Sequence, residues 1–177
     1  AAASGGYKRQ EDAAAKQAIA CGADAASRLP LPAAGMWEGY ATPLAEKARA
    51  DQPSFILASA SRRGRDVAAQ VAALMDAPCF TDGKNITVSG DTVTCETLMY
   101  GGAAVKTAST TAPLVLVTMG DKAYDPAPAD ASRSGDVAVL PYASNGATVT
   151  ERRARPAQTG NLGEAAKVVG VGRGFTE

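Results

Sequence analysis

Apolar residues recur at helical spacing in two stretches of the first fifty residues, which predicts two helices. Residues 11–24, EDAAAKQAIACGAD, place acidic residues first and Gly22 after the last apolar position. This order predicts a short helix that ends near Cys21, followed by a strand-like connection. A second amphipathic helix is predicted within residues 29–51, with Pro43 in its early turns. Its apolar face is formed by Trp37, Tyr40, Ala41, Leu44, Ala45 and Ala48.

The next segment changes from an apolar run to a polar one and then back to helical periodicity. Residues 54–60, SFILASA, predict a short apolar strand, and residues 61–65, SRRGR, predict a loop. Residues 66–78 predict a helix. One face of this helix carries Val67, Val71, Leu74 and Met75. The order helix, strand, loop, helix is typical of a parallel, doubly wound α/β layer.

Beyond residue 78 the pattern becomes one of strands. Residues 85–119 alternate β-branched and polar side chains, with breaks at Gly90-Asp91 and Gly101-Gly102 that predict tight turns. The apolar run at residues 113–119 predicts a buried strand. This segment therefore adds β-hairpins to the α/β layer.

The last third of the chain is predicted to be mostly polar connection. Residues 121–135 are rich in proline and polar side chains, and residues 148–156 predict a last exposed strand. Residues 167–171, KVVGV, predict a buried strand that runs into the glycine turn Gly172-Arg173-Gly174. From the residues alone we expect a doubly wound, mostly parallel sheet with helices on both faces, plus a segment rich in β-hairpins.

Length and charge narrow the class of protein. The chain has 177 residues, enough for one domain of ordinary size or for a domain with the start of a second. Its 18 basic and 18 acidic residues give no net charge, so nothing favours nucleic acid or an anionic membrane as a partner. No apolar run reaches the roughly 18 residues of a membrane helix, so no membrane insertion is expected.

The residue types that most often carry chemistry are scarce. Histidine is absent, which excludes Ser-His-Asp and Cys-His mechanisms within this chain, and the carboxylates form no pair suited to acid–base catalysis. Cys21, Cys79 and Cys95 are far apart and form no Cys-x-x-Cys motif, so neither a disulfide framework nor a metal site is expected. Three free thiols fit a reducing compartment, and the expected location is the cytoplasm.

Two segments are candidates for binding an anion. In residues 58–66 a strand end leads through serines, arginines and a glycine into a helix start, where free amides and the helix dipole favour a phosphate. The residues concerned are Ser59, Ser61, Arg62, Gly64 and Arg65. As a bare pattern the segment is weak, and a solvated loop with ordinary surface arginines is the more common interpretation. The second candidate is the turn Gly172-Arg173-Gly174, which is as ambiguous when taken alone.

The ordered series of these segments is more specific than any one of them. ASASRRGRDVAAQVAALMDAPCFTD, LMYGGAAV, APLVLVTM, ERRARP and KVVGVGRGF follow one another at separations that resemble the α subunit of electron transfer flavoproteins, most closely the FixB-like branch. The resemblance covers residues 54–175 and, more loosely, extends back to the first predicted helix. It implies an adenine-nucleotide-binding-like (Rossmann-like) N-terminal domain over residues 1–160. Residues 161–177 would then be the linker and first strand of an FAD-binding domain, with Gly172, Arg173 and Gly174 at the flavin edge.

The resemblance implies electron transfer rather than turnover of a substrate by this polypeptide. In such proteins FAD carries electrons from dehydrogenases to a quinone reductase or another acceptor, in a heterodimer with a β subunit that commonly carries AMP. The family's first strand before the GAD segment and most of its flavin domain have no counterpart here, so the chain is expected to be trimmed and to bind no FAD with useful affinity. The alternatives are a stand-alone adenine-nucleotide-binding module that uses the Ser59–Arg65 loop, and a structural fragment without a ligand.

The β-rich segment is expected to contact the partner subunit. Residues 85–119 have few large apolar side chains to close a second core, and their paired glycines permit close backbone approach. Met99, Tyr100 and Val105 would be the anchors of this contact. A polar rim would be formed by Arg152, Arg153 and Arg155. The alternative is that these strands complete an internal mixed sheet.

Overall fold

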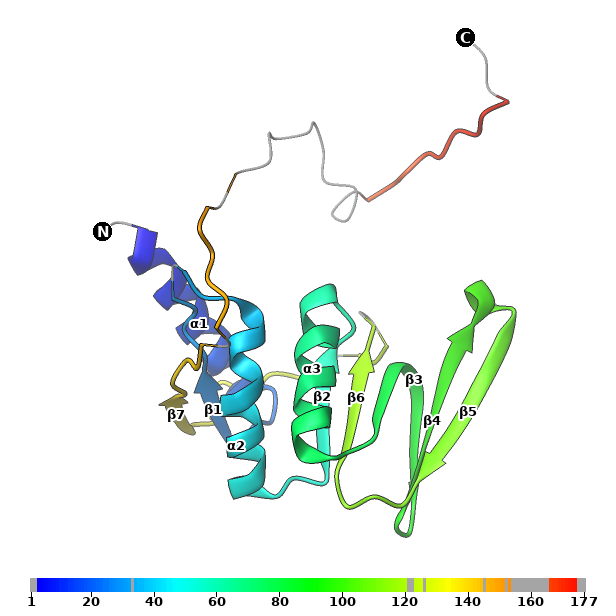
Figure 1. Ribbon diagram of the computed structural model, residues 1–177, viewed down its shortest axis with the longest axis horizontal. Helices are drawn as coiled ribbons and strands as arrows, with labels where there is room; N and C mark the ends of the chain where they lie inside the picture. The colour runs from blue at the N-terminus through cyan, green and yellow to red at the C-terminus, as the bar shows by residue number, and fades with distance from the viewer. Residues whose placement is uncertain are drawn as a thin grey trace.

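The computed structural model has two sheets and three α-helices among the residues that it describes (Figure 1). The described residues are 3–32, 34–120, 123–125, 127–144, 146–151, 153 and 166–174. The first half contains α1 (Ala3–Ala20), β1 (Ala25–Arg28), the 3-10 turn η1 (Trp37–Tyr40), α2 (Ala41–Asp51), β2 (Phe55–Ser59) and α3 (Arg62–Met75). The second half contains β3 (Cys79–Ser89), β4 (Thr92–Met99), the 3-10 turn η2 (Tyr100–Gly102), β5 (Ala104–Thr110), β6 (Val115–Met119) and β7 (Asp136–Val139).

The larger sheet has five strands in the order β2-β6-β3-β4-β5. β6 pairs in parallel with both β2 and β3, whereas β3, β4 and β5 form antiparallel hairpins. The predicted α/β class and the hairpin-rich segment are confirmed. The sheet is mixed because the two hairpins extend it on the side of β3 that lies away from β6.

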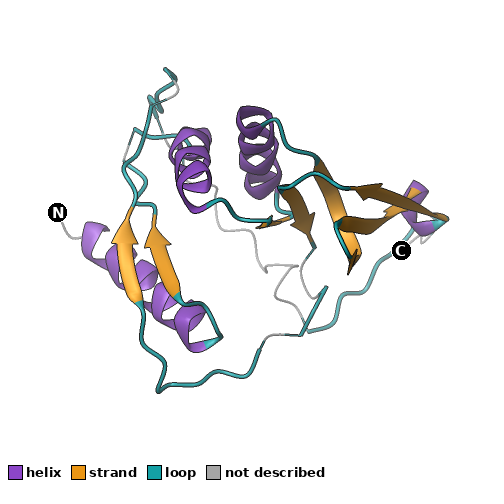
Figure 2. Cartoon of the chain, turned by 90° about the horizontal axis from the view of Figure 1, so that it is seen from below, coloured by secondary structure: helices purple, strands orange, loops and turns teal. Residues whose placement is uncertain are grey.

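The smaller sheet consists of β1 and β7 in parallel, with α1 packed against β1 (Figure 2). We did not predict β7, because its run of four residues is short, exposed and preceded by a polar segment. The connection that precedes β7 is fixed to the end of α1: the Asp130 amide donates to the Ala20 carbonyl at 2.9 Å. Further donors come from Arg133, whose Nε lies 3.0 Å from the Ile19 carbonyl oxygen.

Two apolar clusters stabilise the five-stranded sheet. The first joins α2 and α3 to β6 through Ala45, Val71 and Leu116. The second is formed by strand residues alone, around the buried Cys95 and Val117. Side chains alternate between the two faces of a strand, so the neighbours Leu116 and Val117 enter different clusters. Helices α2 and α3 therefore cover one face, as Figure 1 shows.

Several boundaries differ from those predicted. Residues 62–65, predicted as loop, form the first turn of α3, because Ser61 caps the helix and supplies the acceptor for the Gly64 amide. Leu74 of the predicted apolar face is 44% exposed. The first helix begins well before residue 11 and ends at Ala20, and the second begins as the 3-10 turn η1.

Two predicted strands are wrong for the residues that the structure describes. Residues 148–151 and 153 form no strand, and the rest of the predicted strand at 148–156 lies outside the described residues. Residues 167–171 are exposed and form no strand, and Val169 is 87% exposed. A strand needs a neighbour for its backbone groups, and no described strand lies beside either segment.

Candidate functional site

The first candidate site lies at the carboxyl end of β2, where the chain turns into α3. Ser59 ends the strand, and its Oγ lies 2.7 Å from the Oγ of Ser61. The Ser61 Oγ also accepts a hydrogen bond from the Gly64 amide at 3.1 Å. One of the free amides at the start of α3 is therefore already satisfied by the cap.

Gly64 allows α3 to approach the end of β2. A Cβ at this position would overlap the carbonyl oxygen of Ser59 and would also lie 2.9 Å from its Oγ. No side chain can be accommodated without movement of the strand backbone. The glycine is required for the contact between helix and strand, which is a structural role.

An ion pair crosses the same edge of the sheet. Arg65 on the first turn of α3 places Nη2 2.5 Å from Oδ1 of Asp82 on β3. Asp82 has a left-handed backbone with φ 54°, and its amide donates to Oγ1 of the fully buried Thr118 at 3.0 Å. Asp82 and Thr118 were not identified from the sequence. The Asp82-Gly83 dipeptide marks an interruption of the strand register and was the available signal.

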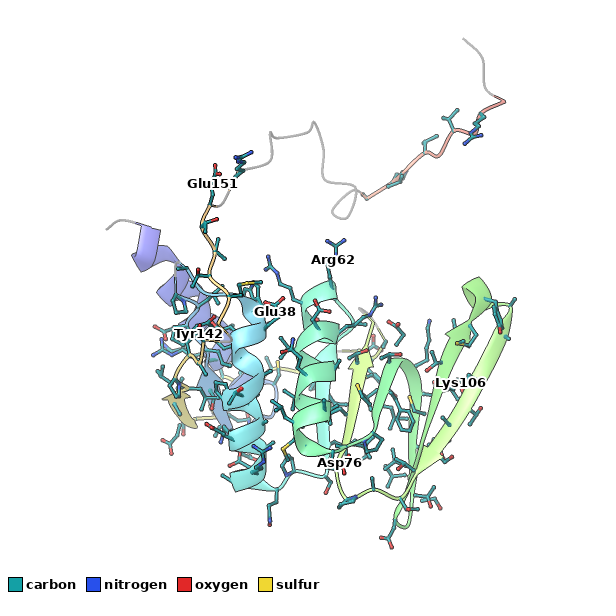
Figure 3. All side chains as sticks on the ribbon, in the orientation of Figure 1. Glu38, Arg62, Asp76, Lys106, Tyr142 and Glu151 are labelled. Carbon is teal, nitrogen blue, oxygen red and sulfur yellow. The ribbon has the colours of Figure 1, made fainter. Side chains whose placement is uncertain are left out.

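The other two arginines of this segment differ in their surroundings. Arg63 places its guanidinium 4.9 Å from the ring centroid of Trp37, a cation–π contact with η1. Arg62 lies at the exposed end of α3 and points away from the helix (Figure 3). The structure thus brings together four of the predicted residues, Ser59, Ser61, Gly64 and Arg65. Most of their polar groups bind one another or Asp82. Arg62 instead points toward solvent.

The second candidate, the turn Gly172-Arg173-Gly174, makes no comparable site. All three residues are exposed, and a Cβ added at Gly172 or Gly174 would meet no atom within 4 Å. The neighbouring Val168, Val169 and Val171 are 60%, 87% and 64% exposed. These described residues form no cradle for a flavin.

An aromatic cluster that sequence reasoning missed lies beside η1. Tyr40 packs edge-on against Tyr142 with 5.6 Å between ring centroids, and Trp37 lies 5.6 Å from Tyr40. The Tyr142 hydroxyl accepts a hydrogen bond from the Met36 amide at 2.9 Å. No local signal in the sequence joins residues more than one hundred positions apart. This cluster fixes the segment after β7 against the start of α2.

The three cysteines are free thiols, as expected. Burial raises the pKa of the Cys79 thiol. Burial also raises the pKa of Cys95, the nearby Glu96 carboxylate adds to this rise, and a backbone hydrogen bond with Lys84 opposes it. Both thiols are thereby held protonated near neutral pH, which argues against a role as nucleophile or metal ligand. In the part of the chain that the structure describes, no group of three metal-ligating side chains occurs.

The β4–β5 hairpin exposes the anchors that the sequence suggested. Tyr100 at the tip is 85% exposed, Val105 is 58% exposed, and Met99 is 37% exposed. Of the proposed rim, Arg153 lies 2.9 Å from Glu151, while Arg152 and Arg155 fall outside the described residues. Among the described helices, none is long and apolar enough to cross a membrane.

Comparison with known proteins shows which family the sequence matches. The model of the electron transfer flavoprotein domain matches residues 1–145. YdiR of Escherichia coli (strain K12), which carries the words electron transfer flavoprotein subunit in its name, is 30% identical over 140 residues, or 78% of this chain and 45% of YdiR. Protein FixB of Shigella dysenteriae serotype 1 (strain Sd197) is 29% identical over 168 residues, or 93% of this chain and 54% of FixB. The chain spans about half the length of the curated relatives that it matches.

Proposed function

Because this chain belongs to the electron transfer flavoprotein domain family, we propose that it acts as part of an electron transfer flavoprotein α subunit of the FixB type. The observation that supports this proposal best is the family match over residues 1–145. Residues 1–160 would be the N-terminal α/β domain, and residues 161–177 the beginning of a flavin-binding domain. The protein would carry electrons and would not itself convert a substrate.

In the assembled heterodimer, bound FAD would supply the redox chemistry, accepting electrons from dehydrogenases and passing them to a quinone reductase or another acceptor. The described residues of this chain do not fit the flavin, since Gly172 to Gly174 are exposed and surround no cavity. The contribution that we assign to this domain is assembly with the β subunit, which would hold AMP.

A second candidate function is a stand-alone adenine-nucleotide-binding module. The position of α3 at the carboxyl end of β2, with three arginines in its first turn, favours it. Against it, the Ser61 hydroxyl and the Arg65 guanidinium are engaged by Gly64 and Asp82. Incoming phosphate would have to displace both contacts, and we therefore rank this function second.

Co-expression tests the first proposal. The chain, tagged and co-expressed with the β subunit from the same organism, should elute with it as a complex of one copy each. Extending the chain through a full-length α subunit should give the complex a flavin absorption spectrum. A chain that never associates with the β subunit would contradict the proposal. Thermal stabilisation of the chain alone by AMP, lost in Arg62→Ala, would instead support the nucleotide-binding module.

A further inference from the structure

An open pocket of about 300 Å³ lies between the start of α2 and the second half of α3. This volume is at the lower end of the range of small-molecule sites. None of its described lining residues belongs to the loop between β2 and α3 or to the turn at Gly172, so it is separate from both candidate sites. The lining residues come from η1 and α2, from α3, and from the segment after β7.

Small side chains leave this space between the two helices. The walls contain Ala41 at the start of α2 and Ala73 on α3, where a leucine or methionine would fill the groove between neighbouring helices. Leu74 also lines the pocket, and its side chain is 44% exposed because the space beside it is open. The pocket therefore offers an apolar wall to a ligand.

Three polar side chains without partners line the same pocket. Glu38 lies between the amino end of α2 and α3 (Figure 3), and it is half-buried. Its carboxylate forms no hydrogen bond or ion pair with the described residues. The half-buried Gln70 amide and the Thr42 hydroxyl also have no side-chain partner among them. Because a partly desolvated carboxylate normally has a partner, these groups indicate a ligand with hydrogen-bond donors.

Charge restricts the class of ligand. None of the described lining residues is basic, and the nearby Arg63 places its guanidinium 4.9 Å from the ring centroid of Trp37. The Glu38 carboxylate would repel a phosphate or a carboxylate. An ammonium group has three N–H donors, which the carboxylate, the Thr42 hydroxyl and the Gln70 amide oxygen can accept.

Contacts at both ends hold the pocket walls in place. Arg49 on α2 places Nη2 2.6 Å from the Leu74 carbonyl oxygen and so joins α2 to the end of α3. At the other end, a Cβ on Gly39 would lie 2.5 Å from the carbonyl oxygen of Ala143, so the segment after β7 packs directly against η1. A site with fixed walls binds a ligand without the entropic cost of ordering them.

We propose that this pocket binds a small organic cation, a primary alkylammonium compound. The ammonium group is held by Glu38, Thr42 and Gln70, and the alkyl chain lies against Ala73 and Leu74. This inference goes beyond the proposed function and does not depend on it, because the site belongs to this chain alone.

Tryptophan fluorescence tests the ligand class. Trp37 is the only tryptophan of the chain and precedes Glu38, so it reports on this pocket. Titration with n-butylammonium in phosphate buffer of constant ionic strength should give a saturable change, whereas n-butanol should give none. Glu38→Gln should weaken binding by roughly tenfold or more. Glu46→Gln, an exposed position on α2 outside the pocket, should leave binding unchanged.

A second pair of variants tests the location. Ala73→Leu fills the pocket from an exposed position of α3 and should abolish the change, while Ala69→Leu, exposed on the same helix but outside the pocket, should not. Circular dichroism and thermal unfolding check that each variant keeps its fold.

Three results would overturn the assignment. The first is a response to n-butylammonium that does not saturate at millimolar concentration. The second is equal binding of n-butanol, which would show a purely apolar site. The third is tighter binding of a capped lysine peptide than of n-butylammonium, which would assign the pocket to a protein side chain instead of a free amine. None of these results bears on association with the β subunit, so the proposed function is tested separately.

Discussion

Gly64 on the first turn of α3 lies so close to Ser59 that a Cβ on Gly64 would overlap the Ser59 carbonyl oxygen. Helix propensity favours alanine over glycine by about 1 kcal/mol, but the overlap with backbone cannot be relieved by rotation of a side chain. We therefore predict that Gly64→Ala lowers the free energy of unfolding by about 1–3 kcal/mol, measured by urea denaturation. Gly120→Ala is the control, since a Cβ there meets no atom within 4 Å. Equal stability of the two variants would contradict the close approach.

Arg133 forms hydrogen bonds with the carboxyl end of α1, although the two are more than one hundred residues apart in the sequence. Its Nε donates to the Ile19 carbonyl at 3.0 Å, and its Nη2 lies 3.1 Å from the Gly22 carbonyl oxygen and 3.2 Å from Oδ1 of Asp24. A cation at a helix carboxyl end is favoured by the helix dipole. Arg133→Ala should therefore lower the free energy of unfolding by about 1–2 kcal/mol.

Arg62 provides the control for Arg133, because it is exposed and lies at the amino end of a helix, α3, rather than at a carboxyl end. A positive charge at a helix amino end is not stabilising, so Arg62→Ala should leave the unfolding midpoint unchanged or raise it slightly. If Arg133→Ala and Arg62→Ala have the same effect in thermal unfolding, the contacts of Arg133 do not contribute to stability.

Tyr142 holds the segment after β7 onto η1 through its hydroxyl. Tyr142→Phe keeps the ring on Tyr40 but removes the acceptor that lies 2.9 Å from the Met36 amide. Leaving this partly buried amide unpaired should cost about 1 kcal/mol of unfolding free energy. Tyr124→Phe is a matched control, because the Tyr124 hydroxyl lies 3.4 Å from the Ile86 amide and the residue is 58% exposed. If Tyr124→Phe lowers the free energy of unfolding as much as Tyr142→Phe or more, the hydrogen bond between Tyr142 and the Met36 amide does not stabilise the fold.

The thiols of Cys95, which is buried, and Cys79, which is partly buried, predict a pH dependence of stability. The native fold raises the pKa of Cys79 and Cys95 by burial, so it favours their protonated form. Their stabilising contribution is fully present below the pKa of an unfolded thiol, about 8.5, and declines as pH rises through the higher native values. We expect stability to fall above roughly pH 9 in urea titrations. The slope should decrease in Cys95→Ala after correction for lost packing, and an unchanged slope in the variants of both thiols would contradict this account.

The parts of this fold that sequence could predict are those set by local periodicity. The strand at Phe55–Ser59, the helix after it and the turn at Gly90-Asp91 each follow from residues within a few positions of one another. The start of α3 was misjudged because the glycine in SRRGR indicates a loop by propensity, whereas its packing against Ser59 requires glycine inside the helix. Long-range pairing explains the other omissions.

Those omissions share a cause. β7 exists because β1 is available to pair with it, and its own sequence is too short to reveal a strand. Conversely, residues 167–171 have a sequence suited to a strand and lack a described neighbour to pair with. At the candidate site, the serines and arginines were identified from local sequence, but Asp82, which pairs with Arg65, comes from a different strand. A strand or a site partner is thus a property of two segments, and local patterns report only one of them.

The last prediction concerns flavin. The turn Gly172-Arg173-Gly174 is exposed, and the described residues around it form neither a strand nor a helix whose amides could hold a phosphate. Addition of FAD to this 177-residue chain should therefore give no saturable change in flavin fluorescence at micromolar concentrations, and Gly172→Ala should behave identically. In the heterodimer with a full-length α subunit, the same Gly172→Ala substitution should weaken flavin retention during gel filtration if the glycine lies at the flavin edge. Micromolar binding of FAD by the 177-residue chain, lost in Gly172→Ala, would contradict this prediction and show that the turn binds flavin.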